Sequence, residues 1–277
     1  MKIGSLCTGY GGLDMAVEAY FNAETIWCAE YDKYASKLIE KRLNIPNYKD
    51  IKSIDWYSLE PIDILTAGYP CQPFSVAGSR KGSDDERHLW PYIKQAISVL
   101  RPRFVILENV RGHLSLGFKE VLADLTEIGY DARWQVVRAS DVGAPHQRAR
   151  LFVVAYPYGT RLQRQSGQGH NVAECPSIDS CTQHESHYGQ VSQLRQRFTP
   201  RSQMYLQAIP NTLDQGRVSS KFVEYMMGLP KGWVTDLDIS WTQQLKMLGN
   251  GVVPQQAYYA LQVLLNNDTP SEQDLYV

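Results

Sequence analysis

The sequence lacks a charge excess of either sign and any long apolar run. Its 277 residues carry a formal net charge of −1, so no overall positive field marks a nucleic-acid binder, although a local basic groove is compatible with this balance. No apolar run reaches the ~18 residues that a membrane helix needs, and no secretory signal is recognisable. We therefore expect a cytoplasmic protein with no membrane partner.

Paired cysteines are missing as well. The chain has five cysteines, an odd number without a Cys-X-X-Cys pair, which excludes a disulfide framework and favours a reducing compartment. One of them, Cys71, lies between Pro70 and Pro73 in the segment GYPCQPFS. Proline fixes φ and removes a backbone donor, so this cysteine is expected on a stiff, non-helical turn. A small buried core residue is the competing interpretation.

Strand-like and helix-like segments alternate through the first ~155 residues, which is typical of βαβ units. We expect an α/β fold with a mostly parallel sheet and helices on both faces. The expected strands are 2–6, 25–29, 62–67, 104–107, 133–138 and 151–155, and the expected helices are 13–21, 32–43, 90–100 and 118–128.

The alternation stops near residue 156. Residues 157–219 are rich in Gln, Ser and Arg and contain few apolar periodicities, whereas ordered segments return at Phe222–Met227 and in a helix from Pro254 to about Leu265. We therefore divide the chain into 1–156, a small region 157–219, and a return segment 220–277.

A glycine-rich turn, with Gly9, Gly11 and Gly12, follows the first strand and opens the first helix. Glycines there let a ligand approach the backbone closely. Glu30 ends the second strand 21 residues after Gly9, where a carboxylate can accept the hydroxyls of a ribose. This indicates a nucleoside-containing cofactor, but the spacing does not separate a dinucleotide from S-adenosylmethionine.

Three further polar groups fall at expected strand ends. Cys71 follows the third clear strand, Glu108 follows the strand FVIL, and Arg148 and Arg150 precede the strand LFVVA. Ligands of open α/β sheets bind at the carboxyl edge, so we expect these groups to face the cofactor. Arg148 and Arg150 alternate and are expected on one face of an extended segment. Each group alone could be structural, as a core, capping or solvated residue.

Six segments in this order resemble the cytosine-C5 DNA methyltransferases, the S-adenosylmethionine-dependent enzymes of bacteria and phages. The segments are Gly9–Gly12, Ala29–Asp32, Gly68–Ser75, Glu108–Val110, Gln147–Arg150 and Gly249–Pro254. The resemblance covers about 1–156 and 220–265. It implies a Rossmann-like S-adenosylmethionine-dependent methyltransferase fold with a small target-recognition domain at 157–219.

The resemblance implies a catalytic role for four residues. Cys71 would add to C6 of a flipped cytosine, so that C5 attacks the sulfonium methyl group. Glu108 would hold N3 and share a proton there, which requires a carboxyl group of raised pKa in a dry site. Arg148 and Arg150 would orient the base at O2 and steady Glu108.

The same resemblance implies the cofactor contacts. Glu30 would take the ribose hydroxyls, Tyr31 would lie along the adenine, Asp50 and Ile51 would meet its edge, and Asn250, on the loop before the last helix, would approach the methionine end. The expected cofactor-contacting glycines are Gly9, Gly11, Gly12 and Gly68. Cys7 departs from the family pattern, which usually has phenylalanine there.

The expected partner is double-stranded DNA. The protein is expected to act as a monomer, with a companion restriction endonuclease left open. Arginines outnumber acidic residues in 157–219, which suits phosphate and guanine contacts, although a solvated linker has the same composition. The residues His170, Cys175, Cys181, His184 and His187 match no standard zinc spacing, so no metal site is expected.

Other functions remain open from sequence. RNA cytosine methylation would use the same residues. Amino-group methylation fits less well, because the turn at the third strand end reads Pro-Cys-Gln. A NAD-linked oxidoreductase would use Glu30 but leave Cys71 and Glu108 without a joint role. A non-catalytic DNA-binding module would make Cys71 dispensable.

Overall fold

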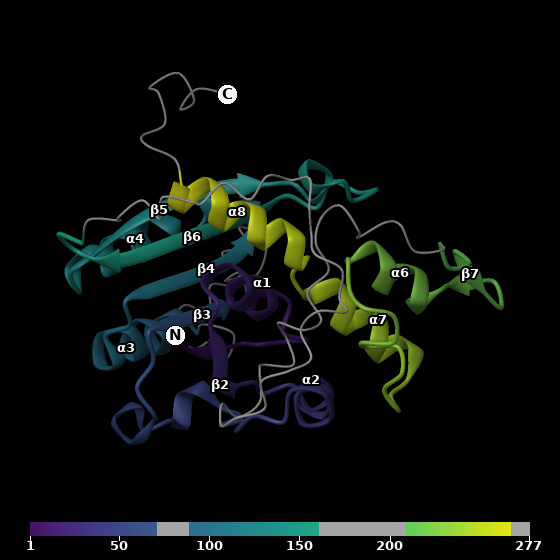
Figure 1. Cartoon of the computed structure of the whole chain (residues 1–277), viewed down its shortest axis with the longest axis horizontal. Helices are drawn as coiled ribbons and strands as arrows, with labels where there is room; N and C mark the ends of the chain where they lie inside the picture. Colours follow the sequence, from purple (N-terminus) through teal and green to yellow (C-terminus); the bar gives the residue numbers. More distant parts are fainter. Residues whose placement is uncertain (71–88, 161–208, 267–277) are drawn as a thin grey trace, which may run out of the picture.

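The fold is built on a six-stranded sheet (Figure 1). The computed structural model describes residues 1–70, 89–160 and 209–266. The strand order is β2-β1-β3-β4-β6-β5, with parallel pairing throughout β2, β1, β3 and β4, and antiparallel pairing of β6 with both its neighbours. The mostly parallel sheet is thereby confirmed. The strands are β1 (Lys2–Leu6), β2 (Glu24–Ala29), β3 (Ile64–Gly68), β4 (Phe104–Val110), β5 (Tyr130–Val137) and β6 (Arg150–Pro157).

Helices cover both faces of this sheet, as the alternation predicted. On one face, Ala257 of α8 shares a buried apolar cluster with Ile64 of β3, and on the other, Ile97 of α3 shares one with Leu65. Figure 1 shows α8 crossing the sheet close to α1. The α-helices are α1 (Gly12–Phe21), α2 (Lys33–Leu38), α3 (Trp90–Leu100), α4 (Phe118–Glu127), α6 (Ser220–Met226), α7 (Trp241–Asn250) and α8 (Pro254–Asn266).

The helix expected from Asp32 to Leu43 forms in two parts. Asp32 caps α2, because its carboxylate accepts hydrogen bonds from the backbone N–H of Tyr34 at 2.8 Å and of Ala35 at 3.1 Å. The helix widens into a π-helix, η1 (Ile39–Leu43), and ends where Asn44 adopts a left-handed conformation and donates to the carbonyl of Ile39.

The antiparallel direction of β6 decides where the arginine segment lies. A residue that precedes a parallel strand lies at the amino edge of the sheet, but Arg150 begins β6 and pairs with Val110 at the carboxyl edge. Strand β4 continues three residues beyond the predicted FVIL, so Glu108 lies inside the strand. The predicted alternation of Arg148 and Arg150 is wrong, because Arg148 has a φ of 32° and lies before the strand.

The return segment packs on the glycine turn after β1. Tyr10 is fully buried, and its hydroxyl donates to the carbonyl of Val252 at 2.7 Å. The indole Nε1 of Trp233 donates to the carbonyl of Tyr10 at 2.9 Å. Helix α7, which the sequence analysis missed, ends at Asn250, so this residue terminates a helix and does not lie on a loop.

Some predicted features lie outside the described residues. These are Cys71, the zinc candidates between 170 and 187, and the greater part of region 157–219. From that region the structure describes the antiparallel pair β7 (Leu213–Asp214) and β8 (Arg217–Val218). The remaining short helices are of the 3-10 type: η2 (Ile51–Ser53), η3 (Trp56–Ser58), η4 (Arg111–Ser115) and η5 (Ala139–Val142).

The contact between Gly251 and the ring of Tyr10 gives a stability test. A Cβ atom at Gly251 would overlap this buried ring, so Gly251→Ala should lower the free energy of unfolding by about 1–3 kcal/mol. A Cβ atom at Gly249, within α7, would meet nothing within 4 Å, so Gly249→Ala should unfold at the wild-type urea concentration or slightly above it. Equal losses in both variants would contradict the packing role of Tyr10.

Candidate active site

A cavity of about 430 Å³ opens at the carboxyl edge of the parallel strands. Its walls come from the ends of β1, β2, β3 and β4, the start of β6, and the last turns of α7. Among the residues predicted for the site, those that line it are Gly9, Gly12, Glu30, Gly68, Glu108, Arg150 and Asn250. Residues near the start of the chain and residues 243–252 therefore meet around one cavity.

The glycine turn and Glu30 form one wall of the cavity. Gly9 has a φ of 58°, which a side chain rarely tolerates. Its backbone N–H donates to Glu30 Oε2 at 2.8 Å, and the N–H of Asp32 donates to Glu30 Oε1 at 2.7 Å. Burial raises the pKa of Glu30, and these two hydrogen bonds oppose the rise. Each carboxylate oxygen keeps a further lone pair that can accept a hydroxyl group.

Glu108 and Arg150, which also line the cavity, form a buried ion pair. Glu108 Oε1 lies 3.0 Å from Arg150 Nε, and the Glu108 side chain is only 8% exposed. Burial raises the pKa of Glu108 to about 7, although Arg150 and then Arg148 oppose this. A carboxyl group of this kind can hold or release a proton near neutral pH, as an acid or base in catalysis requires.

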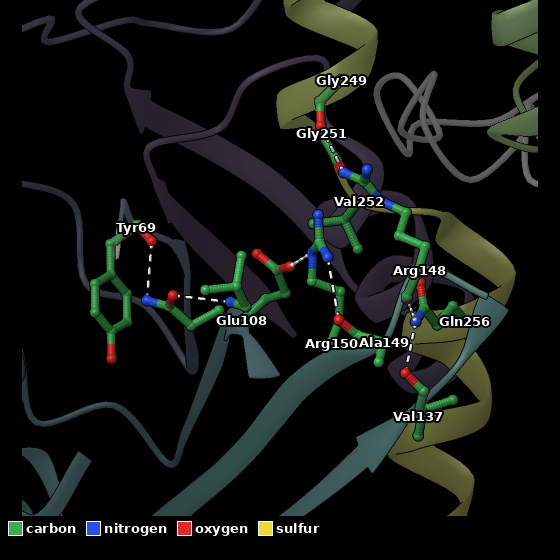
Figure 2. Close-up of polar contacts among 12 residues, drawn as sticks. Tyr69, Glu108, Val137, Arg148, Ala149, Arg150, Gly249, Gly251, Val252 and Gln256 are labelled. Carbon is green, nitrogen blue, oxygen red and sulfur yellow. Dashed lines mark hydrogen bonds and ion pairs between the residues drawn. The ribbon is translucent and has the colours of Figure 1, made fainter. Parts of the chain in front are cut away.

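The side chain of Arg148 reaches the backbone of Gly249 and Gly251 (Figure 2). Its Nη2 donates to the carbonyl of Gly249 at 2.8 Å and to that of Gly251 at 2.5 Å. Arg148 does not line the cavity. The two arginines of the Gln147–Arg150 segment thus serve different walls of the site, whereas the sequence analysis predicted that they act together on one base.

The segment that leads into Cys71 is held in place from β4. The side-chain Nδ2 of Asn109 donates to the carbonyl of Tyr69 at 3.0 Å. The hydroxyl of Tyr69 lies 2.9 Å from Nε2 of His113, a buried histidine whose Nδ1 lies 2.8 Å from the carbonyl of Leu116. Gly68, Tyr69 and Pro70 line the cavity, and Cys71 follows Pro70 in the sequence.

Four predicted cofactor residues lie outside the cavity wall. Tyr31 is 78% exposed. Asp50 caps the short helix η2 by accepting from the N–H of Lys52, and Ile51 is packed in the core. Gly11, with a φ of 82°, caps α1. Their contacts with a cofactor stay predictions.

The structure adds polar residues that the sequence analysis missed. Asp14, in the first turn of α1, is buried in the cavity wall and accepts from Thr66 Oγ1 at 2.5 Å and Ser5 Oγ at 3.0 Å. Burial raises the pKa of Asp14 to about 6 against these hydrogen bonds. Lys246 of α7 also lines the cavity and lies 3.5 Å from Asp32. A single acid within the apolar stretch GLDMAV was a usable signal for Asp14.

Two cysteines are described, and neither has the properties of a nucleophile. Cys7 lines the cavity and Cys28 is fully buried. Burial raises the pKa of each thiol to about 12, so both stay protonated near neutral pH.

Over residues 1–70, 89–160 and 209–266, no three His, Cys, Asp or Glu side chains gather as metal ligands. Within the same residues, no helix is both long and apolar enough to cross a bilayer.

Curated relatives match the first part of the chain. The Type II methyltransferase M.Bsp6I of Bacillus sp. (strain RFL6) is 36% identical over 166 residues, which are 56% of this chain and 52% of that protein. The Type II methyltransferase M.HhaI of Haemophilus parahaemolyticus is 31% identical over 168 residues, 59% of this chain and 51% of that protein. The matched part thus spans about half the length of these relatives.

Solved structures resemble the fold over nearly the whole chain. Spodoptera frugiperda DNMT2 gives a TM-score of 0.67 at 16% identity, over 95% of this chain and 99% of that chain. S. pombe Dnmt2 methyltransferase gives a TM-score of 0.65 at 17% identity, over 96% and 98%. The family model for C-5 cytosine-specific DNA methylases matches residues 1–177. The chain belongs to the C-5 cytosine-specific DNA methylase family.

Proposed function

We propose that this protein is a DNA (cytosine-5-)-methyltransferase, which moves the methyl group of S-adenosylmethionine to C5 of a flipped cytosine in double-stranded DNA. The observation that carries the proposal is the buried pair of Glu108 and Arg150, which lines the same cavity as the Gly68–Pro70 segment leading into Cys71. Family membership supports the same reaction and argues against the oxidoreductase interpretation.

The cavity has the chemistry that S-adenosylmethionine needs. Glu30 offers free lone pairs for ribose hydroxyls beside a glycine turn in the left-handed conformation. A Cβ atom at Gly68 would lie 3.6 Å from Glu108 Oε2, so the glycine leaves room next to the acid. Asn250 lines the cavity from the end of α7. These residues would hold the cofactor, which supplies an electrophilic methyl group when it is bound.

The reaction divides between Cys71 and Glu108. The thiolate of Cys71 adds to C6, and the electron pair released from the C5–C6 double bond makes C5 nucleophilic toward the methyl group. Glu108, which is partly protonated near pH 7, donates to N3 so that negative charge does not build up on the ring. Loss of the C5 proton to solvent then restores the double bond and expels the thiolate.

Arg150 orients Glu108 throughout this sequence. Its Nε contacts Glu108 Oε1, which leaves Oε2 for the base. The fixed positive charge also keeps the pKa of Glu108 from rising as far as burial alone would drive it. We assign Arg150, on this basis, the contact with O2 of the base.

The proposal extends to the organisation of the protein. Residues 1–156 and 220–277 form the catalytic part, and 157–219 form the target-recognition region. The protein acts as a cytoplasmic monomer on base-flipped DNA and produces 5-methylcytosine. The Type II names of the relatives support restriction-modification as the context, with a companion restriction endonuclease as a partner.

The covalent step gives the direct test. Cys71→Ala should abolish methyl transfer to duplex DNA. A duplex that contains 5-fluorocytosine traps the wild-type protein as a denaturant-stable adduct, because fluorine at C5 blocks release of the thiol, and Cys71→Ala should form no such adduct. Cys28→Ala is the matched control, since its thiol is buried and protonated, and it should retain both activities. Adducts are counted by denaturing electrophoresis with labelled DNA.

Two results would contradict the proposal. Full activity in Cys71→Ala would show that Cys71 is not the nucleophile. Methyl transfer to tRNA with none to duplex DNA would show that the substrate is RNA and not double-stranded DNA.

The raised pKa of Glu108 predicts a specific pH dependence of stability. The native state holds the Glu108 proton more tightly than the unfolded state. The protonated group therefore contributes fully to the free energy of unfolding below pH ~4.5, and this contribution is lost as pH rises through about 7. Because a shift of one pKa unit corresponds to about 1.4 kcal/mol, the free energy of unfolding of wild type should fall by roughly 3 kcal/mol more than that of Glu108→Gln across this pH range. Urea unfolding from pH 4.5 to 8 measures the difference.

The matched control is Glu127→Gln on α4, whose side chain is 70% exposed. Its unfolding should follow the wild-type pH curve. Parallel curves for wild type and Glu108→Gln would show that Glu108 is ionised throughout, and the acid role would fail.

A further inference from the structure

Arg148 binds the two carbonyl groups that flank Asn250. One guanidinium nitrogen, Nη2, donates to Gly249 at 2.8 Å and to Gly251 at 2.5 Å (Figure 2). Asn250, between them, is the last residue of α7 and lines the cavity. The contacts join residues about one hundred positions apart in the sequence. The guanidinium group therefore fixes the backbone on both sides of a residue that faces the site.

The charge of Arg148 suits this place in the fold. The last carbonyl groups of a helix lack partners within the helix, and they carry a partial negative charge. Within α7 no basic residue occupies the last turn, so Arg148 supplies from another segment the cation that a helix carboxyl end favours. A rigid guanidinium also loses less rotamer entropy per hydrogen bond than a lysine would.

The backbone of Arg148 is itself held in an unusual conformation. Its φ of 32° is in the left-handed region, which is costly for a residue with a side chain. The side-chain Nε2 of Gln256, in α8, donates to the carbonyl of Arg148 at 2.8 Å and to that of Val137 at 2.7 Å. This hydrogen-bonded support, together with the following strand, directs the Arg148 side chain toward α7 and the Arg150 side chain toward Glu108 (Figure 2).

We propose that Arg148 is a positioning residue for S-adenosylmethionine, which acts by holding Gly249–Gly251 so that Asn250 faces the cofactor. The inference rests on the proposed function for the identity of the ligand. It assigns to Arg148 a different task from Arg150, although the two are separated by a single residue. Arg148 contacts neither the cofactor nor the base, and its effect is expressed through the backbone that carries Asn250.

The test measures cofactor binding without DNA, so that no catalytic step contributes. If loss of the guanidinium leaves the Asn250 segment in its binding geometry 1–10% of the time, Arg148→Ala should weaken the binary affinity for S-adenosylmethionine by about ten- to a hundredfold. Isothermal titration calorimetry on the full chain gives this number. Arg101→Ala is the matched control and should bind the cofactor as wild type does, because the Arg101 guanidinium donates to the carbonyl of Ile128 at the end of α4 and does not line the cavity.

Chemical rescue separates positioning from a general loss of structure. Guanidinium ion, added far below its unfolding concentration, should restore part of the cofactor affinity of Arg148→Ala and leave that of wild type unchanged. Wild-type affinity in Arg148→Ala would overturn the proposal. Weak binding that guanidinium does not restore would also overturn it.

Arg148→Lys keeps the test decisive if the alanine variant does not fold. A lysine side chain is one bond shorter than arginine and cannot place its nitrogen where Nη2 lies, so the variant should bind the cofactor more weakly while its thermal midpoint without cofactor stays at the wild-type value. Unchanged affinity in Arg148→Lys would count against the proposal. Failure of the wild-type protein to bind S-adenosylmethionine would instead contradict the proposed function, and the titration of wild type alone measures this.

Discussion

The ion pair between Glu108 and Arg150 is the contact on which the rest of the site depends. Two charged groups leave water at the carboxyl edge of the sheet, and each makes the burial of the other tolerable. The geometry follows from β6 running against its neighbours, which delivers Arg150 to the edge where β4 ends. Because burial outweighs the nearby positive charges, Glu108 keeps a pKa of about 7 and remains a proton-holding group rather than a permanent anion. The direction of β6 thus determines which charged group lies beside the acid.

The second constraint is long-range closure of the cavity by the return segment. Tyr10 is clamped between Val252 and Trp233, and Gly251 gives its ring the space it needs. The same stretch of chain carries Asn250, whose flanking carbonyl groups are bound by Arg148. Residues near both ends of the described chain therefore set the shape of one wall. The packing of Tyr10 and the placement of Asn250 therefore depend on the same stretch of chain.

Much of this architecture follows from sequence pattern, because strands and helices leave local signals. The bounds of β1 and α3 are those predicted, and Asp32 caps α2 as its position before the helix implied. Glu30, which follows β2, and Glu108, which lies inside β4, both line the cavity at the carboxyl edge, as expected. The direction of β6 leaves no local signal, so the prediction for Arg148 and Arg150 could not separate their roles. Helix α7 was missed because its packing partners lie in distant segments. The sequence marks Asp14 as a single acid in an apolar stretch, but its hydrogen bonds from Ser5 and Thr66 depend on the fold.

The bond from Tyr10 to Val252 spans 242 positions, and it has a consequence for how the protein is made. A ribosome delivers the glycine turn and Glu30 early, but the opposite wall of the cavity exists only after the segment around residue 250 has emerged. Contacts of such separation are costly to close and form late in folding. A nascent chain that ends after β6 therefore lacks residues that complete the ligand cavity. A ligand that binds this cavity therefore stabilises chains that contain the segment around residue 250 over chains that lack it.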